Sequence, residues 1–223
     1  MNSVFRYMIL TVFCGLFALH STAAAQDDSS GSPTGKPSKI EKTEKTEKVT
    51  KKPNGLASVT LEDLAVNFPE VEDWEQSEIQ KYPTEDLGFS IDYESSEGGK
   101  VTIYVYKGGQ KQIPDDISDK IIKNELNKAK GEIQKVADMG YYDNLKEVKN
   151  DTVTLGGTSG KIKSLHTLYN FSARNQNLAS EIYIFGHKNR FIKIRATRSR
   201  NNNESGDKMV AELLAELDTF FSN

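Results

Sequence analysis

The residues that could do chemistry are concentrated in the last predicted hairpin. Between His187 and Arg200 the sequence holds six basic residues and no acidic one. Such a cluster can bind a carboxylate, a phosphate or a sugar acid. Because side chains alternate across a strand, Lys193 and Arg195 should share one face. A solvated sheet edge that is protected by charge would give the same pattern. The predicted anion- or partner-binding site consists of Arg190, Lys193, Arg195 and Arg198.

The histidines do not indicate a metal site. His166 and His187 are the two that follow residue 25, and neither a His-x-His nor a Glu-x-x-His spacing occurs. Cys14 is the only cysteine, so thiolate chemistry and disulfides are excluded after residue 25. We expect a structural role for His166 within a strand and an exposed position for His187 at a hairpin tip. No metal and no cofactor are predicted.

Two other motifs have structural explanations. The run Gly156–Lys161 lacks the first glycine, the hydroxyl residue after the lysine and the following helix of a phosphate loop, so we predict a hairpin turn. Trp74, the only tryptophan, is flanked by acidic residues. A carbohydrate subsite would use such a group, but a tryptophan that anchors the N-terminal segment to the core is the favoured interpretation. The flanking acids are Glu70, Glu72, Asp73 and Glu75.

The N-terminus predicts export. Arg6 precedes an apolar stretch from Met8 to Leu19, and three alanines follow at 23–25. This arrangement is typical of a signal peptide, here residues 1–25, with cleavage after Ala25. The apolar stretch is shorter than the roughly 20 residues of a membrane span, so we expect no transmembrane segment in the mature chain. The predicted location is secreted or periplasmic.

Residues 26–57 are predicted to be a disordered linker rich in Lys and Glu, because they contain too few large apolar residues to form a core. Residues 58–223 should form a single domain. The whole chain has a net charge of −3, whereas Arg6 and the basic stretch 26–54 leave a net charge of −6 for the rest. An acidic domain argues against nucleic acid as a partner.

Hydrophobic periodicity predicts the elements that must position these residues. A short amphipathic turn at 59–68 precedes two alternating strands, and Pro114 with Asp115 and Asp116 begins a helix that ends at Gly140. The order is ββαββββα, which is typical of an α+β fold with an antiparallel sheet of about six strands packed by two amphipathic helices. The expected strands are 88–94, 101–107, 145–155, 161–171, 179–186 and 190–198, and the second helix starts near 207.

Several of these segments carry a resemblance. The runs beginning Gly88-Phe-Ser-Ile-Asp-Tyr, Val101-Thr-Ile-Tyr-Val-Tyr, Ile113-Pro-Asp-Asp and Tyr183-Ile-Phe-Gly-His resemble a group of uncharacterised exported bacterial proteins. More distantly, the element order over residues 74–222 resembles the Mog1/PsbP-like fold. The resemblance implies a non-enzymatic binding or accessory module and carries over no catalytic residue.

The sequence therefore favours an exported, non-catalytic binding or accessory domain on a flexible tether. The expected partner is an anionic envelope polymer or a protein. The alternative is a metal-independent hydrolase of an envelope polymer that uses Asp/Glu acid-base chemistry, since acidic residues are abundant.

Overall fold

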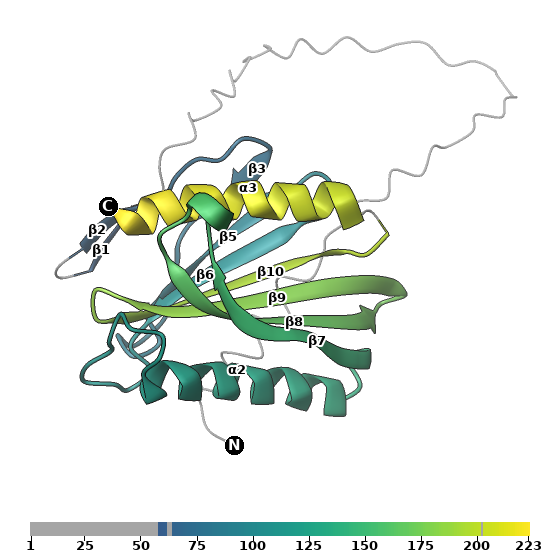
Figure 1. The fold of residues 1–223 in the computed structure, drawn as a ribbon, viewed down its shortest axis with the longest axis horizontal. Coiled ribbons are helices and arrows are strands. Elements are labelled where there is room, and N and C mark those ends of the chain that lie inside the picture. Colours follow the sequence, from purple (N-terminus) through teal and green to yellow (C-terminus); the bar gives the residue numbers. More distant parts are fainter. Residues whose placement is uncertain (1–57, 62–63, 202) are drawn as a thin grey trace, which may run out of the picture. The chain divides into compact units, whose positions relative to one another are not determined.

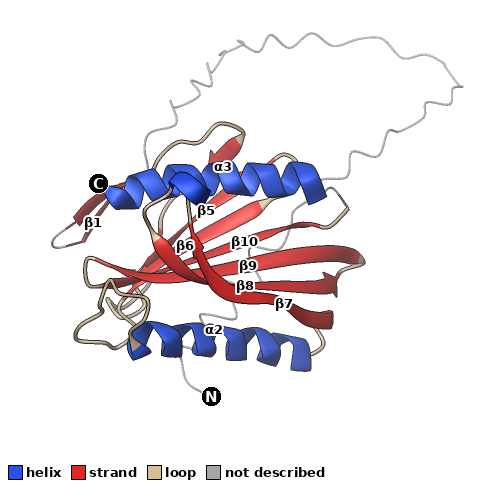
Figure 2. Cartoon of the chain, in the orientation of Figure 1, coloured by secondary structure: helices blue, strands red, loops and turns tan. Residues whose placement is uncertain are grey.

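An antiparallel sheet of eight strands with one helix on each face forms the fold (Figures 1 and 2). The computed structural model describes residues 58–61, 64–201 and 203–223. The predicted signal peptide and linker lie outside these residues. The strand order is β3-β5-β6-β10-β9-β8-β7, and β4 pairs with β5. The predicted α+β class is confirmed.

The six long strands are those predicted from sequence alternation, and the structure adds short ones before them. In the sheet the strands are β3 (Trp74–Gln76), β4 (Gln80–Lys81), β5 (Phe89–Ser95), β6 (Lys100–Tyr106), β7 (Asp143–Thr154), β8 (Lys163–Ala173), β9 (Gln176–His187) and β10 (Arg190–Ser199). At three and two residues, β3 and β4 are too short to show a period. A 3-10 turn, η1 (Gly157–Ser159), joins β7 to β8.

The predicted amphipathic turn at 59–68 is wrong. This stretch contains two strands, β1 (Ser58–Leu61) and β2 (Leu64–Asn67), which pair with each other. Val59 lies opposite Val66 in their register. β-Branched residues favour strands, and this preference outweighed the helical spacing of the leucines.

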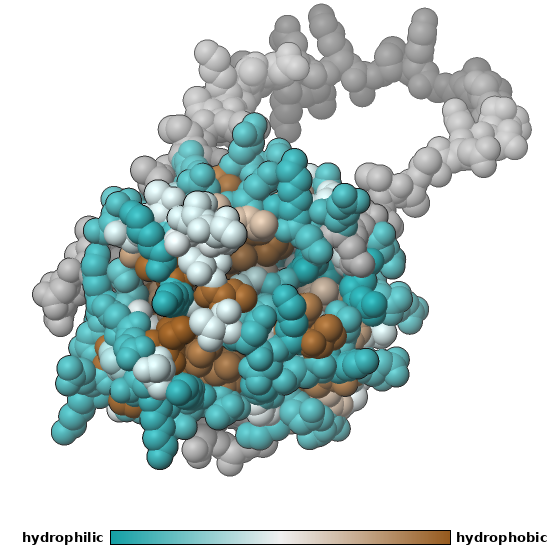
Figure 3. Space-filling view, viewed as in Figure 1, coloured by the Kyte–Doolittle hydropathy of each residue, from teal (hydrophilic) through white to brown (hydrophobic). Residues whose placement is uncertain are grey.

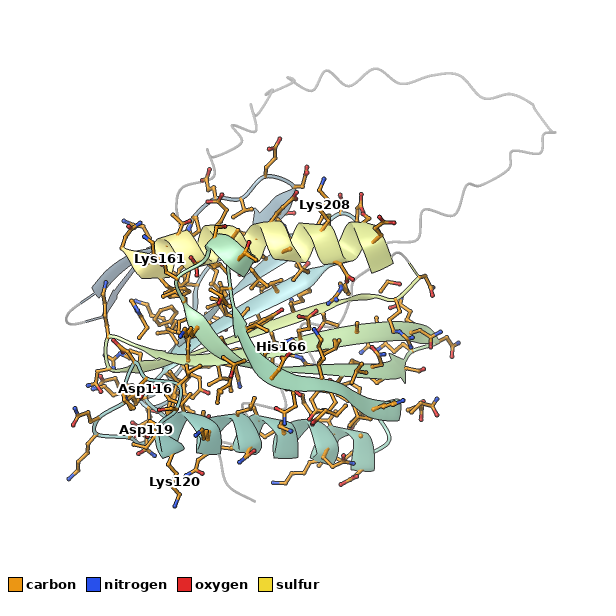
Figure 4. The ribbon with its side chains drawn as sticks, in the orientation of Figure 1. Asp116, Asp119, Lys120, Lys161, His166 and Lys208 are labelled. Carbon is orange, nitrogen blue, oxygen red and sulfur yellow. The ribbon has the colours of Figure 1, made fainter. Side chains whose placement is uncertain are left out.

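Helix α2 (Lys120–Asp138) begins later than predicted, because Asp116 stabilises a turn before the helix and Asp119 is the N-cap. The Asp116 carboxylate accepts a hydrogen bond from the Ser118 amide at 2.9 Å and holds a turn. Asp119 is the N-cap, and its side chain accepts from the Ile121 amide at 2.7 Å. Figure 4 labels both aspartates at this end of the helix.

Helix α2 ends as the sequence predicted. Gly140 has a φ of +79°, which favours glycine, and its amide bonds to the Ala137 carbonyl at 2.8 Å. The Tyr141 amide bonds to the Val136 carbonyl at 3.2 Å, which completes a Schellman motif. Gly131, in contrast, has no atom within 4 Å of the position that a Cβ would occupy, so it does not mark close packing on the sheet.

The two helices cover opposite faces, and each closes its own core. Helix α3 (Asn203–Ser222) packs on the face that includes Ile91, Ile103 and Phe185. Helix α2 packs on the other face, which includes Phe171 and Phe191. The buried residues of α3 are Val210, Leu213, Leu214, Leu217 and Phe221, and the apolar ones of α2 are Ile122, Leu126, Ala129, Ile133 and Val136. Figure 3 shows hydrophobic side chains between the helices on an otherwise largely hydrophilic face.

Strand β10 lies in the middle of the sheet and joins its two halves. It pairs with β9 through a tight hairpin and with β6, far earlier in the chain. In this register Lys193 lies between Tyr104 on one side and Ile184 on the other. The basic residues predicted to form a site therefore lie on a central strand, so their surroundings depend on which face each one occupies.

Candidate functional site

The alternation of β10 divides the four predicted site residues between the two faces of the sheet. Lys193 and Arg195 share the α2 face, as the sequence predicted. Arg198 lies on the α3 face, where it meets Glu181 and Asp207. Arg190, at the start of the strand, forms an ion pair with Glu85 at 2.9 Å. The structure therefore brings two of the four residues together.

Lys193 is surrounded by aromatic rings. Its side-chain nitrogen lies 4.5 Å from the centroid of the Tyr104 ring and 5.6 Å from that of Tyr106. Such distances allow cation-π attraction. The residue is only 7 % exposed, and no carboxylate of the described residues lies within 4.0 Å of its ammonium. Lys193 is thus a buried cation without an ion-pair partner in the described part of the chain.

Arg195 continues this site along the strand. Its Nη2 donates to the Tyr142 hydroxyl at 3.0 Å, and its Nε donates to the Ser180 hydroxyl at 3.2 Å. Both partners are neutral, and no described carboxylate forms an ion pair with this guanidinium. We call Lys193, Arg195, Tyr104, Tyr106 and Tyr142 the tyrosine–cation site.

Helix α2 supplies the nearest charges. Burial lowers the pKa of Lys193 to about 8, with Lys128 and Arg195 adding to the effect, while Glu132 and Glu125 oppose it. Glu125 is itself engaged, because it accepts from the Tyr106 hydroxyl at 2.8 Å and from Lys128 at 3.3 Å. A pKa decrease of this size means that the site disfavours the charged lysine by about 3 kcal/mol. An anion bound beside Lys193 would offset this cost.

The opposite face of β10 carries a closed ion-pair network. Arg198 Nη1 lies 2.7 Å from Glu181, without hydrogen-bond geometry, and its Nε donates to Asp207 at the start of α3. The Tyr183 hydroxyl also donates to Glu181. Burial would raise the pKa of Glu181, but the hydrogen bond from His166 and the charge of Arg198 outweigh it and lower the pKa to about 2.

His166 completes this network and is structural, in agreement with the prediction. Its Nδ1 lies 2.7 Å from Asp151 and its Nε2 lies 3.1 Å from Glu181. The ring stacks on Tyr183 with centroids 4.8 Å apart, and the residue is only 4 % exposed. Burial alone would lower the pKa of His166, but the bonds with Glu181 and Asp151 raise it. Figure 4 shows His166 on the strands between the two helices. Both nitrogens are thus engaged by carboxylates.

Two other sequence interpretations are settled by position. Trp74 is buried in the core under α3, at 8 % exposure, while its acidic neighbours are exposed. This agrees with an anchoring role. His187 is half-buried and its ring lies 5.4 Å from that of Phe221, so the prediction of an exposed tip residue is wrong. The hairpin tip consists of Lys188 and Asn189, both with positive φ.

The run Gly156–Lys161 forms the predicted turn, and α3 holds it closed. The buried Asp218 carboxylate accepts from the Lys161 amide at 2.9 Å and from the Ile162 amide at 2.7 Å. No local sequence pattern predicts this contact, because the partners are 57 and 56 residues apart. These amides bind an aspartate of the protein itself.

Comparisons with known proteins find similar solved structures but no matching family or curated sequence. No protein-family profile matches the chain, and no curated protein sequence does. The chain is similar to the cyanobacterial PsbP protein of Synechocystis sp. PCC 6803, with 8 % identity, a TM-score of 0.45, and coverage of 73 % of this chain and 93 % of that one. It is also similar to a Pseudomonas aeruginosa protein of unknown function, with 10 % identity, a TM-score of 0.34, and coverage of 69 % and 90 %.

The residues that the structure describes contain no group of three or more His, Cys, Asp or Glu side chains that could hold a metal ion. They also contain no helix that is long and apolar enough to cross a membrane.

Proposed function

We propose that the chain is an exported, non-catalytic binding or accessory domain that holds an anionic group of an envelope polymer or a protein partner in the tyrosine–cation site. Export is inferred from the apolar stretch between Arg6 and the alanines at 23–25. The binding role depends chiefly on one observation: Lys193 and Arg195 point from the same face of β10 toward tyrosines, and neither has a carboxylate partner among the described residues.

Physical chemistry supports an anionic ligand at this position. Buried charges are normally paired, because an unpaired one loses its hydration without compensation. The other two arginines of β10 follow that rule, since Arg190 pairs with Glu85 and Arg198 with Glu181. Unpaired cations in a sheltered site are candidates for ligand recognition. Tyrosine rings and hydroxyls around them would add apolar contact and hydrogen bonds.

The hydrolase alternative finds less support. Acid-base hydrolysis needs two carboxyl groups that face a shared substrate space. The buried carboxylates that the structure describes are engaged elsewhere, Glu125 with Tyr106 and Asp218 with the β7–β8 turn. The half-buried Glu181 contacts His166 and Arg198. We therefore favour binding over hydrolysis.

Binding is tested by titrating the purified chain with peptidoglycan fragments and with an anionic polysaccharide at low and high salt. We expect wild-type affinity to decrease as salt increases, because mobile ions screen the attraction. The double variant Lys193→Gln and Arg195→Gln should bind at least about tenfold more weakly, since a charge-assisted hydrogen bond contributes roughly 1.5–3 kcal/mol.

The matched control is the double variant Lys188→Gln and Arg200→Gln. It removes the same charge from exposed positions of the same hairpin and should bind as the wild type does. Equal loss in both double variants would mean that net charge, and not the tyrosine–cation site, attracts the ligand. No binding of the wild type to either polymer would contradict the assignment of an anionic envelope polymer as the partner.

A further inference from the structure

We propose that the Lys193 amine captures its ligand covalently, as a Schiff base with a small carbonyl compound that also carries a carboxylate, such as a 2-oxo acid. The inference depends on the proposed anion site, because Arg195 would hold the carboxylate while Lys193 meets the carbonyl carbon. It goes beyond reversible anion binding by assigning a nucleophile.

The geometry favours a nucleophilic amine. Lys193 is more than nine-tenths buried, and it forms no ion pair within the described residues. An amine needs a free lone pair to attack a carbonyl, and proteins obtain one by desolvating a lysine beside other cations. Here the charges of Arg195 and Lys128 act in that direction, whereas Glu125 and Glu132 on α2 act against it. Burial is the largest effect, and the pKa of Lys193 is lowered to about 8.

The neighbouring arginine selects the ligand class. Lys193 and Arg195 are two residues apart on one strand face, so their Cα atoms are separated by about 7 Å. A guanidinium has five N–H donors, and the bonds to Tyr142 and Ser180 use two. The others can take a carboxylate. A carboxylate on Arg195 would place a carbonyl group of the same small molecule near the Lys193 amine.

The reaction is a condensation that needs no further reagent. The lone pair of the neutral Lys193 nitrogen attacks the carbonyl carbon and forms a C–N bond. The nitrogen gives up its two protons, and the carbonyl oxygen leaves with them as water. A C=N bond remains, and no oxidation or reduction takes place. Hydrolysis by the reverse path releases the ligand.

The test is reductive trapping with pyruvate. The purified chain is incubated with pyruvate and cyanoborohydride at pH 7, and reduced adducts are located by peptide mass spectrometry. At this pH a lysine with a lowered pKa has a larger neutral fraction, so we expect Lys193 to be labelled about tenfold faster than the exposed Lys208. Acetone, which has the carbonyl but no carboxylate, should label Lys193 much less than pyruvate does.

Two variants separate this inference from the proposed function. Lys193→Arg keeps the positive charge but has no primary amine, so it should form no adduct at residue 193. Arg195→Gln should lower the rate of pyruvate labelling at Lys193. If Lys193 reacts no faster than Lys208 while wild-type anion binding is intact, the covalent inference is wrong and the binding site stands. If the wild type shows neither anion binding nor selective labelling, both are wrong.

Discussion

Glu181 Oε1 lies 2.7 Å from Arg198 Nη1, directly behind the strand face that carries Lys193 and Arg195. On the α3 face, Glu181 also contacts His166 and Tyr183. On the α2 face, the cations of β10 face tyrosines instead. On the α3 face the Arg198 cation thus pairs with carboxylates, whereas Lys193 and Arg195 on the α2 face have no carboxylate partner among the described residues. The two faces should respond differently to mutation.

The first prediction concerns the ion-pair network on the α3 face. Glu181→Gln leaves Arg198 and His166 without their shared carboxylate, so it should lower the free energy of unfolding at pH 7 by about 3 kcal/mol. The measurement is urea denaturation. The control is Glu212→Gln, which removes an exposed carboxylate of α3 and should change the free energy by less than about 0.5 kcal/mol. A small effect of Glu181→Gln would mean that Asp151 and Asp207 suffice to hold the two cations.

Acid should weaken the same network. The pKa of Glu181 is lowered to about 2 in the folded chain, below its ordinary value of 4.5. A lowered carboxyl pKa stabilises the fold above the unfolded pKa, and that stability is lost as the pH falls from about 4.5 toward 2. Thermal melts between pH 2 and 6 should show a midpoint that decreases more steeply for the wild type than for Glu181→Gln. Parallel curves would contradict this account.

His166 should act in the opposite direction. Its pKa is raised in the folded chain by the bonds with Glu181 and Asp151. A raised histidine pKa stabilises the fold fully below the unfolded pKa of about 6.5, and the contribution is lost as the pH rises through the folded value. The stability advantage of the wild type over His166→Gln should therefore be largest below about pH 6.5 and smaller at pH 9. A titration of the imidazole by NMR gives the folded pKa directly.

Removing the charge of Lys193 on the α2 face should stabilise the fold. Lys193→Met keeps the approximate length of the side chain and avoids a buried ammonium, so the free energy of unfolding at pH 7 should increase by about 1–3 kcal/mol. Lys208→Met, at an exposed position of α3, should change it by less than about 0.5 kcal/mol. The gain should shrink from pH 8 to pH 10.5, where the folded chain releases the proton first. A loss of stability would show that the contact with Tyr104 outweighs the cost of burial.

Processing gives a prediction that does not depend on the site. If the chain is exported, N-terminal sequencing of the product outside the cytoplasm should begin at Gln26, after the small residues at 23–25. A product that retains Met1 would contradict cleavage.

Local patterns predicted most of the fold, and the limits of that prediction have physical causes. The alternation of apolar and polar residues predicted the hairpin of β5 and β6, and Gly140 predicted the end of α2. The same alternation placed Lys193 and Arg195 on one face. It could not place tyrosines beside them, because these contacts are distant in sequence. Tyr104 reaches the site through the pairing of β6 with β10, and Tyr142, which lies between α2 and β7, is 53 residues from Arg195. The same alternation separates Arg198 from Lys193 and Arg195. The ion pairs of Arg190 with Glu85 and of Arg198 with Glu181 could not be predicted from a local pattern.

The contact of Asp218 with the β7–β8 turn has a consequence for the order of folding. The acceptor of the Lys161 and Ile162 amides is synthesised more than fifty residues after them. Until then these two amides lack this acceptor. Contacts so distant in sequence slow folding.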